Sequence, residues 1–146
     1  MSNYLIVGGT RGIGRALVIQ LLAQGHQVTV WARNKVDLAG ANVVVNNPAD
    51  QAPDLGGLPE VLDGLVYCPG TISLKPFSRL SPEDFLQDFN INLLGAVRSL
   101  QAVTPQLKKS PQASVVLFST VAVALGMPFH ASIAASKAAV EGLVKS

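Results

Sequence analysis

Residues 4–14 read YLIVGGTRGIG, a short apolar run that leads directly into a cluster of glycines. An unbroken apolar run of this length is typical of a parallel strand that is buried on both faces. From Gly12 onward the apolar residues take helical spacing, and Gly25 suits the end of that helix. The segment therefore predicts a strand, a tight glycine turn and a helix. The predicted apolar face of the helix comprises Ile13, Leu17, Val18, Leu21 and Leu22.

The rest of the chain continues this alternation of strands and helices. Further strands are predicted at residues 27–31, 42–45, 64–68 and 114–118, where β-branched and other apolar residues gather. Several prolines and glycines between residues 46 and 63 predict a connection with at most one helical turn. Ser81 and Pro82 suit the start of a long helical region that runs to about Lys109, and residues 132–146 form a final Ala-rich helix. We therefore predict an α/β fold with a doubly wound parallel sheet, in one domain that spans residues 1–146.

Composition supports this fold and excludes several functions. The chain is 49% hydrophobic and 14% charged, well below the roughly 25% charged residues of average domains, which suits a sheet covered on both faces. The net charge of +2 comes from residues scattered along the chain, with no cluster longer than Lys108-Lys109, so we expect no nucleic-acid partner.

Cys68 is the only cysteine, which rules out an intramolecular disulfide and favours a packing role. The N-terminus does not resemble a signal peptide, and no apolar run approaches the roughly 18 residues of a membrane span. We expect a cytoplasmic protein.

The last predicted strand has an unusual composition for a sheet edge. Residues 115–118 are VVLF, an unbroken apolar run of the kind found where a strand has neighbours on both sides. We therefore expect the natural protein to continue beyond Ser146 with at least one more strand.

The glycine turn predicts a dinucleotide site. Gly8, Gly12 and Gly14 lie between a strand and a helix, where absent side chains allow a pyrophosphate to approach the helix N-terminus. An acidic residue about 20 positions past such a turn favours NAD, whereas Arg there suits the 2′-phosphate of NADP. The second strand ends in Trp31-Ala32-Arg33-Asn34, and Arg11 lies within the turn. These two Arg residues predict NADP(H), although each also suits a solvated surface position.

The turn, read as GGTRGIG over residues 8–14 with the spacing Gly8-x-x-x-Gly12-x-Gly14, resembles that of the short-chain dehydrogenase/reductase family. It differs from the GxGxxG form of other Rossmann proteins. The resemblance covers nearly the whole chain and implies a Rossmann fold that reduces carbonyls or oxidises alcohols with NAD(P), commonly as a dimer or tetramer. The cofactor-binding residues that it implies are Gly8, Thr10, Arg11, Gly12, Ile13, Gly14, Arg33, Asn34, Asn47, Pro48, Cys68, Pro69, Gly70 and Lys137.

The same resemblance implies which part of the cofactor two of these segments would contact. Asn47 and Pro48 would lie along the adenine, and residues 68–70 would line the ribose and nicotinamide. The family usually has Asn-Asn-Ala-Gly where this chain has Tyr67-Cys68-Pro69-Gly70, so only the glycine is shared. We therefore expect the hydrogen bonds in this segment to differ from those of the family.

The catalytic stretch also resembles that of the family, through Ser119-Thr120, Gly126-Met127-Pro128 and Ser136-Lys137-Ala138-Ala139. The resemblance assigns ribose binding to Lys137, a water relay to Asn92 and the substrate carbonyl to Thr120, with Ser119 as an alternative to Thr120. Each residue also has a structural interpretation: Thr120 as a cap, Asn92 as a helix-bending residue and Lys137 as a solvated lysine.

Ile133 stands four residues before Lys137, where the family has its catalytic tyrosine. An isoleucine cannot exchange a proton, so another acid is needed for the family reaction. His130, one helical turn before Ile133, is the first candidate because imidazole titrates near neutral pH. Ser132 is the second candidate, and a surface position for His130 is the alternative.

Three hypotheses follow. The first is an NADP(H)-dependent oxidoreductase for a small carbonyl or alcohol substrate, with Asn92, Thr120, Lys137 and His130 in the catalytic site. The second is a catalytically silent NADP(H)-binding sensor or subunit, because Ile133 replaces the tyrosine. The third is an assembly role, in which the last helix packs against a partner chain as a homodimer or homotetramer.

Overall fold

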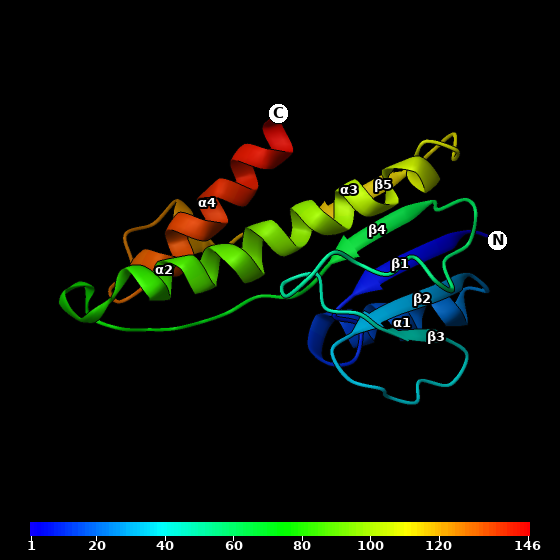
Figure 1. The fold of residues 1–146 in the computed structure, drawn as a ribbon, viewed down its shortest axis with the longest axis horizontal. Coiled ribbons are helices and arrows are strands. Elements are labelled where there is room, and N and C mark those ends of the chain that lie inside the picture. The colour runs from blue at the N-terminus through cyan, green and yellow to red at the C-terminus, as the bar shows by residue number, and fades with distance from the viewer.

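Five parallel strands form a single sheet in the order β3-β2-β1-β4-β5 in the computed structural model, which describes residues 1–146 (Figure 1). Their bounds are β1 (Asn3–Val7), β2 (Gln27–Ala32), β3 (Asn42–Val45), β4 (Gly64–Tyr67) and β5 (Ser114–Leu117).

The central strand β1 pairs with β2 on one side and with β4 on the other. At its carboxyl end, Val7 is in register with Trp31 of β2 and with Tyr67 of β4. The chain builds the sheet outward from β1 to β3, and then returns to add β4 on the opposite side. In such sheets a ligand binds outside the carboxyl ends of the strands at the point where the order reverses. That point lies here between β1 and β4.

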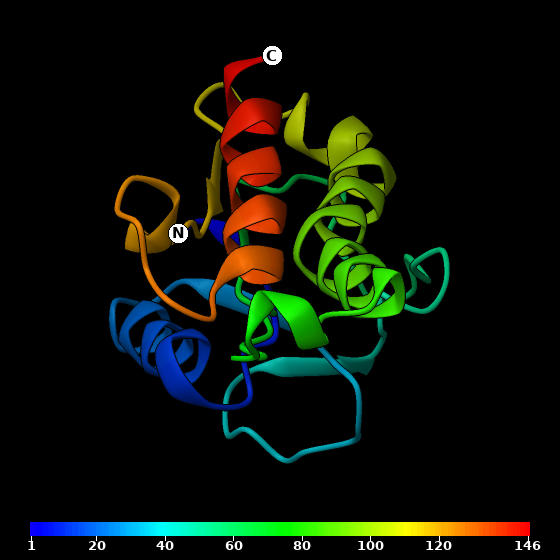
Figure 2. The ribbon, with the colours of Figure 1, turned by 90° about the vertical axis from the view of Figure 1, so that its left-hand side faces the viewer.

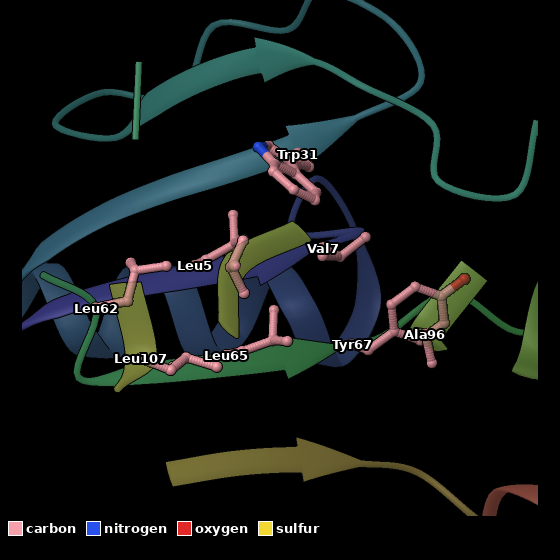
Figure 3. Packing of buried hydrophobic residues seen from close by; sticks show 9 residues of the cluster. Leu5, Val7, Trp31, Leu62, Leu65, Tyr67, Ala96 and Leu107 are labelled. Atoms are coloured by element: carbon pink, nitrogen blue, oxygen red, sulfur yellow. The ribbon is translucent and has the colours of Figure 1, made fainter. Parts of the chain in front are cut away.

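Helices cover both faces of the sheet. One face packs against α1 (Gly12–Ala23) and the other against α3 (Gly95–Leu107). Alternate residues of each strand serve the two faces. The core on the α3 side is drawn in Figure 3 and comprises Leu5, Val7, Trp31, Leu62, Leu65, Tyr67, Ala96, Val103 and Leu107. The core on the α1 side comprises Ile6, Val18, Val28, Val30, Ala32 and Val66.

The helical region after β4 is continuous but contains an irregular turn. It consists of α2 (Pro82–Phe89), a π-helical turn η2 (Asn90–Leu94) and α3. Ser81 caps α2 in a reciprocal capping box with Asp84, as its place before Pro82 predicts. The phenol of Tyr67 donates a 2.6 Å hydrogen bond to the carbonyl oxygen of Ile91 within the π turn. Such turns are frequent at functional sites.

The last helix, α4 (Ala131–Lys145), packs against α2 and the π turn (Figure 2). Single 3₁₀ turns lie before α2, at η1 (Phe77–Arg79), and after β5, at η3 (Val121–Val123). The start of α4 therefore lies beside α2, and its C-terminal end points away from α2 (Figure 2).

The predicted fold class and all five strands are confirmed, with boundaries that shift by one residue at most. The connection over residues 46–63 contains no helix, as expected. Ile13 is the exception on α1, because its side chain is 67% exposed and does not join the core. Strand β5 has β4 as its one neighbour within these residues. No helix has both the length and the apolar character that crossing a bilayer requires.

Candidate functional site

A cleft of about 890 Å³ lies at the carboxyl ends of the strands, where the strand order reverses. Its walls come from the glycine turn, the end of β2, residues 46–50 after β3 and residues 68–71 after β4. This volume is within the range of pockets that hold cofactors and other small molecules. Thr10, Ile13 and Asn34, which the sequence predicted at the cofactor, are among the lining residues.

The glycine turn leaves open space at the start of α1. Gly12 has a φ of +56°, and a Cβ there would meet nothing within 4 Å. A Cβ at Gly14 would lie 2.5 Å from the carbonyl oxygen of Gly8, so the turn closes only without a side chain. Arg11 occupies the N-cap position of α1, and its side chain forms no capping hydrogen bond. No side-chain cap therefore occupies the first backbone N–H groups of α1. Backbone donors at a helix N-terminus are suited to bind a phosphate group.

Arg11 and Arg33 bring positive charge to this cleft. Both side chains line it, both are exposed, and neither takes part in the two ion pairs of the chain, Lys75–Asp84 and Lys109–Glu60. Their guanidinium groups are therefore available for an anion. Asp37, the nearest acid after β2, is not part of the lining.

The segment after β3 forms the opposite wall. Asn47 and Pro48 line the cleft, and Asn47 Nδ2 donates a 2.6 Å hydrogen bond to the carboxylate of Asp50. Asp50 also lines the cleft, although the sequence reasoning did not select it. No local pattern marks Asp50, because only the folded loop turns it toward the cleft.

The segment after β4 forms the floor near the sheet. Cys68 and Pro69 line the cleft, and the Cys68 backbone N–H donates to the carbonyl of Val7. Pro69 has no N–H to donate, whereas an alanine has one. Burial raises the pKa of the Cys68 thiol to about 11, so the thiol stays protonated and unreactive at neutral pH.

Asn92 and Lys137 meet beside Gly70. A Cβ at Gly70 would lie 3.3 Å from Asn92 Oδ1 and 3.7 Å from Lys137 Nζ. Lys137 is 8% exposed, and its Nζ donates a 2.9 Å hydrogen bond to the carbonyl of Phe118. Burial lowers the pKa of Lys137, because a desolvated ammonium is disfavoured. Asn92 Oδ1 is buried and has no hydrogen-bond partner.

None of the predicted catalytic residues lines the cleft itself: Asn92 and Lys137 lie beside Gly70, which does line it, and the others lie elsewhere. Thr120 Oγ1 accepts a 3.3 Å hydrogen bond from the Ala122 N–H, so it caps the 3₁₀ turn η3. The Ser119 hydroxyl donates to Glu141. His130 stands at the N-cap of α4 rather than within the helix, with Nδ1 2.6 Å from the carbonyl oxygen of Pro128.

The position of the family tyrosine is part of the packed interior. Ile133 is 5% exposed, and the adjacent Ser132 is fully buried. The Ser132 hydroxyl donates a 2.6 Å hydrogen bond to Asp88 Oδ2. The structure therefore places Asn92 and Lys137 beside Gly70 in the wall of the cleft without exposing either to it. Thr120, His130 and Ser132 are hydrogen-bonded elsewhere.

A second hollow of about 560 Å³ lies at the opposite, amino ends of β1 and β2, with His26 and Asn42 in its walls. Turn glycines Gly40 and Gly57 line it, but no helix N-terminus does. The dinucleotide prediction therefore applies to the larger cleft alone.

Known proteins share both the sequence pattern and the fold. The profile of the family described as short chain dehydrogenase matches residues 56–146, more than half of the chain. A 3-oxoacyl-[acyl-carrier-protein] reductase from Staphylococcus aureus is 29% identical and aligns with 99% of this chain. A 3-ketodihydrosphingosine reductase from Mus musculus is 28% identical over the same share. The chain spans 66% of the first relative and 50% of the second.

Solved structures agree with the fold. The TT0495 protein from Thermus thermophilus has a TM-score of 0.85 at 27% identity, with 98% of this chain and 67% of that protein covered. A short chain dehydrogenase family protein from Francisella tularensis has a TM-score of 0.87 at 20% identity, over 99% and 62% of the two chains.

Proposed function

Because this chain belongs to the short-chain dehydrogenase family, we propose that it is an NADP(H)-dependent oxidoreductase for a small carbonyl or alcohol substrate. The observation that carries the proposal is the cleft, in which a glycine turn and two unpaired Arg side chains share one opening at the switch point of the sheet. The names of the two relatives above, a 3-oxoacyl and a 3-keto reductase, favour carbonyl reduction.

The residues present fit a phosphorylated dinucleotide. Open space at Gly12 admits a pyrophosphate against the free N–H groups of α1, and Arg11 and Arg33 suit a 2′-phosphate. Asn47 and Pro48 would hold the adenine, and Gly70 leaves room for the nicotinamide ribose beside Lys137. When bound, the nicotinamide supplies or accepts the hydride.

The chain's own residues would contribute orientation. Lys137 Nζ would donate to the ribose hydroxyls, and Asn92 Oδ1 would offer an acceptor beside Gly70. Thr120 would hold the substrate oxygen after its hydroxyl leaves the Ala122 N–H. His130 would supply the proton by turning its ring away from the Pro128 carbonyl, with Ser132 as the alternative donor.

One observation favours a second function. Ile133 is packed into the interior where the family has its tyrosine, so no group at that position can move a proton. A catalytically silent NADP(H)-binding sensor or subunit keeps the cleft and has no need of such a group. We also propose a cytoplasmic location and assembly into a homodimer or homotetramer for either function.

Two measurements on one sample separate these functions. NADPH binding is titrated by fluorescence, and NADPH oxidation is followed across a panel of ketones, aldehydes and quinones. Binding with turnover supports the oxidoreductase, and binding without turnover supports the silent protein. Absence of NADPH binding would contradict both.

A further inference from the structure

A buried carboxylate lies next to the candidate site and belongs to none of the roles described above. Asp88, in α2, is 1% exposed, and no cation pairs with it. Its Oδ1 accepts a 2.5 Å hydrogen bond from the Thr71 hydroxyl, and its Oδ2 accepts one from Ser132. A buried charge is costly and persists only with donors arranged around it. Asp88 therefore links the loop after β4 with helix α4.

The carboxylate determines the direction of the next hydrogen bond. The Thr71 hydroxyl has a single proton, which points at Asp88 Oδ1. The Thr71 oxygen is left as an acceptor, and Asn92 Nδ2 donates to it at 2.7 Å. Asn92 Nδ2 also donates to the backbone carbonyl of Asp88 at 2.8 Å. Both amide protons of Asn92 are thus committed.

This arrangement leaves one orientation for the Asn92 amide. Turning the amide over would place its oxygen against two acceptors, the Thr71 oxygen and the Asp88 carbonyl. The observed orientation aims Oδ1 at the side of Gly70 where Lys137 Nζ also lies. An oxygen there attracts the ammonium or a ribose hydroxyl, whereas an NH₂ group there would repel the ammonium.

We propose that Asp88 is a positioning residue that acts through Thr71 to hold the Asn92 amide with its oxygen toward Gly70 and Lys137. The functional value of this role rests on the proposed function, because the orientation of Asn92 matters most when a nicotinamide ribose lies beside Gly70. The geometric statement, however, concerns only residues of this chain and is tested without a cofactor.

Four variants test the proposal. Asp88→Asn keeps the shape but supplies an NH₂ donor to Thr71, which allows the hydroxyl to turn toward Asn92. Thr71→Val removes the hydroxyl without changing any charge. Thr71→Ser is the conservative variant that should restore the link. Thr104→Val is the matched control, because the Thr104 hydroxyl bonds only to the Leu100 carbonyl within α3.

The first readout is hydrogen exchange of the Asn92 side-chain amide, followed by ¹⁵N NMR on folded samples. We expect slow exchange in the wild type, Thr71→Ser and Thr104→Val, because both amide protons are bonded to buried acceptors. We expect fast exchange or a shifted resonance in Asp88→Asn and Thr71→Val. Unchanged Asn92 signals in Thr71→Val would overturn the proposal even if Asp88→Asn failed to fold.

The second readout is affinity for NADPH compared with 2′,5′-ADP, which lacks the nicotinamide half. Asp88→Asn and Thr71→Val should weaken NADPH about tenfold, which corresponds to about 1.4 kcal/mol, and leave 2′,5′-ADP within about twofold. Equal losses for the two ligands would mean a general structural role and would overturn the proposal. Failure of the wild type to bind NADPH would contradict the proposed function instead, while the Asn92 exchange rates would still decide the role of Asp88.

Discussion

Arg33 is the residue on which the choice of cofactor depends. Its guanidinium is exposed at the end of β2, lines the cleft and has no acidic partner. Arg33→Ala should weaken NADPH binding about 10- to 100-fold, because charge-assisted hydrogen bonds to a 2′-phosphate are lost, and should leave NADH unchanged. Fluorescence titration with both cofactors checks this. Arg15→Ala, on the exposed part of α1 outside the cleft, is the control. Equal losses for NADPH and NADH would count against an NADP(H) site.

Ile133 decides whether the family chemistry is present. Ile133→Tyr would place a phenol one helical turn before Lys137, and we expect it to create or raise carbonyl reduction. If the wild type is already active through His130, His130→Ala should lower the rate by about 10²- to 10⁴-fold with little change in NADPH affinity. NADPH absorbance gives both rates. Activity that appears only in Ile133→Tyr would support the silent protein, and a rate insensitive to His130→Ala would remove His130 from the mechanism.

The site residues divide according to how local their signal is. Gly8, Gly12 and Arg33 were identifiable from the sequence because a turn and a strand end place them within one continuous unit. Asp88 and Thr71 were not identifiable from the sequence, because their hydrogen bond joins residues 17 positions apart. The hydrogen bond between Asp88 and Ser132 joins residues 44 positions apart. A residue whose partners come from other elements leaves no periodic pattern in the sequence.

Among the elements, the glycine turn leaves no room for a side chain at Gly14. Gly14→Ala would place a methyl group 2.5 Å from the Gly8 carbonyl oxygen, so the strand and helix must separate. We expect a loss of about 1–3 kcal/mol in the free energy of unfolding together with weaker NADPH binding. Gly142→Ala is the matched control on α4, where a Cβ meets nothing within 4 Å. This variant should gain about 0.5–1 kcal/mol, since alanine favours a helix. Urea unfolding compares the two, and a neutral Gly14→Ala would contradict the close approach.

The helical region after β4 shows which features of an element the sequence predicts. The start of α2 was predictable because Ser81 and Asp84 form their capping box within one turn. The π turn at residues 90–94 was not predictable, because its Ile91 carbonyl accepts a hydrogen bond from Tyr67, a residue 24 positions away in the sequence. A helix cap depends on residues that are neighbours in the sequence, whereas the π turn contacts a strand that is a neighbour only in the folded structure.

At the scale of the whole molecule, the parallel direction of the strands was predictable from the alternation of strands and helices, since parallel strands require crossover connections. The strand order is a finding of the structure. The places of α4 and of the outer edge of β5 depend on packing that no local pattern encodes. Val115 and Val116 of β5 are 43% and 44% exposed. An apolar strand edge of this kind favours pairing with another chain.

We therefore predict that a protein of these 146 residues self-associates in solution through β5. Val116→Lys should raise the monomer fraction, because a lysine at a strand edge disfavours further pairing while its aliphatic stem still covers the sheet. Size-exclusion chromatography with light scattering measures the fraction over a dilution series. Val144→Lys is the matched control, since Val144 is 67% exposed on α4 and away from the sheet edge. A larger effect of Val144→Lys would move the association surface to α4, in agreement with the hypothesis that the last helix packs against a partner chain. An unmodified chain that stays monomeric over the dilution series and unfolds cooperatively would contradict association by either surface.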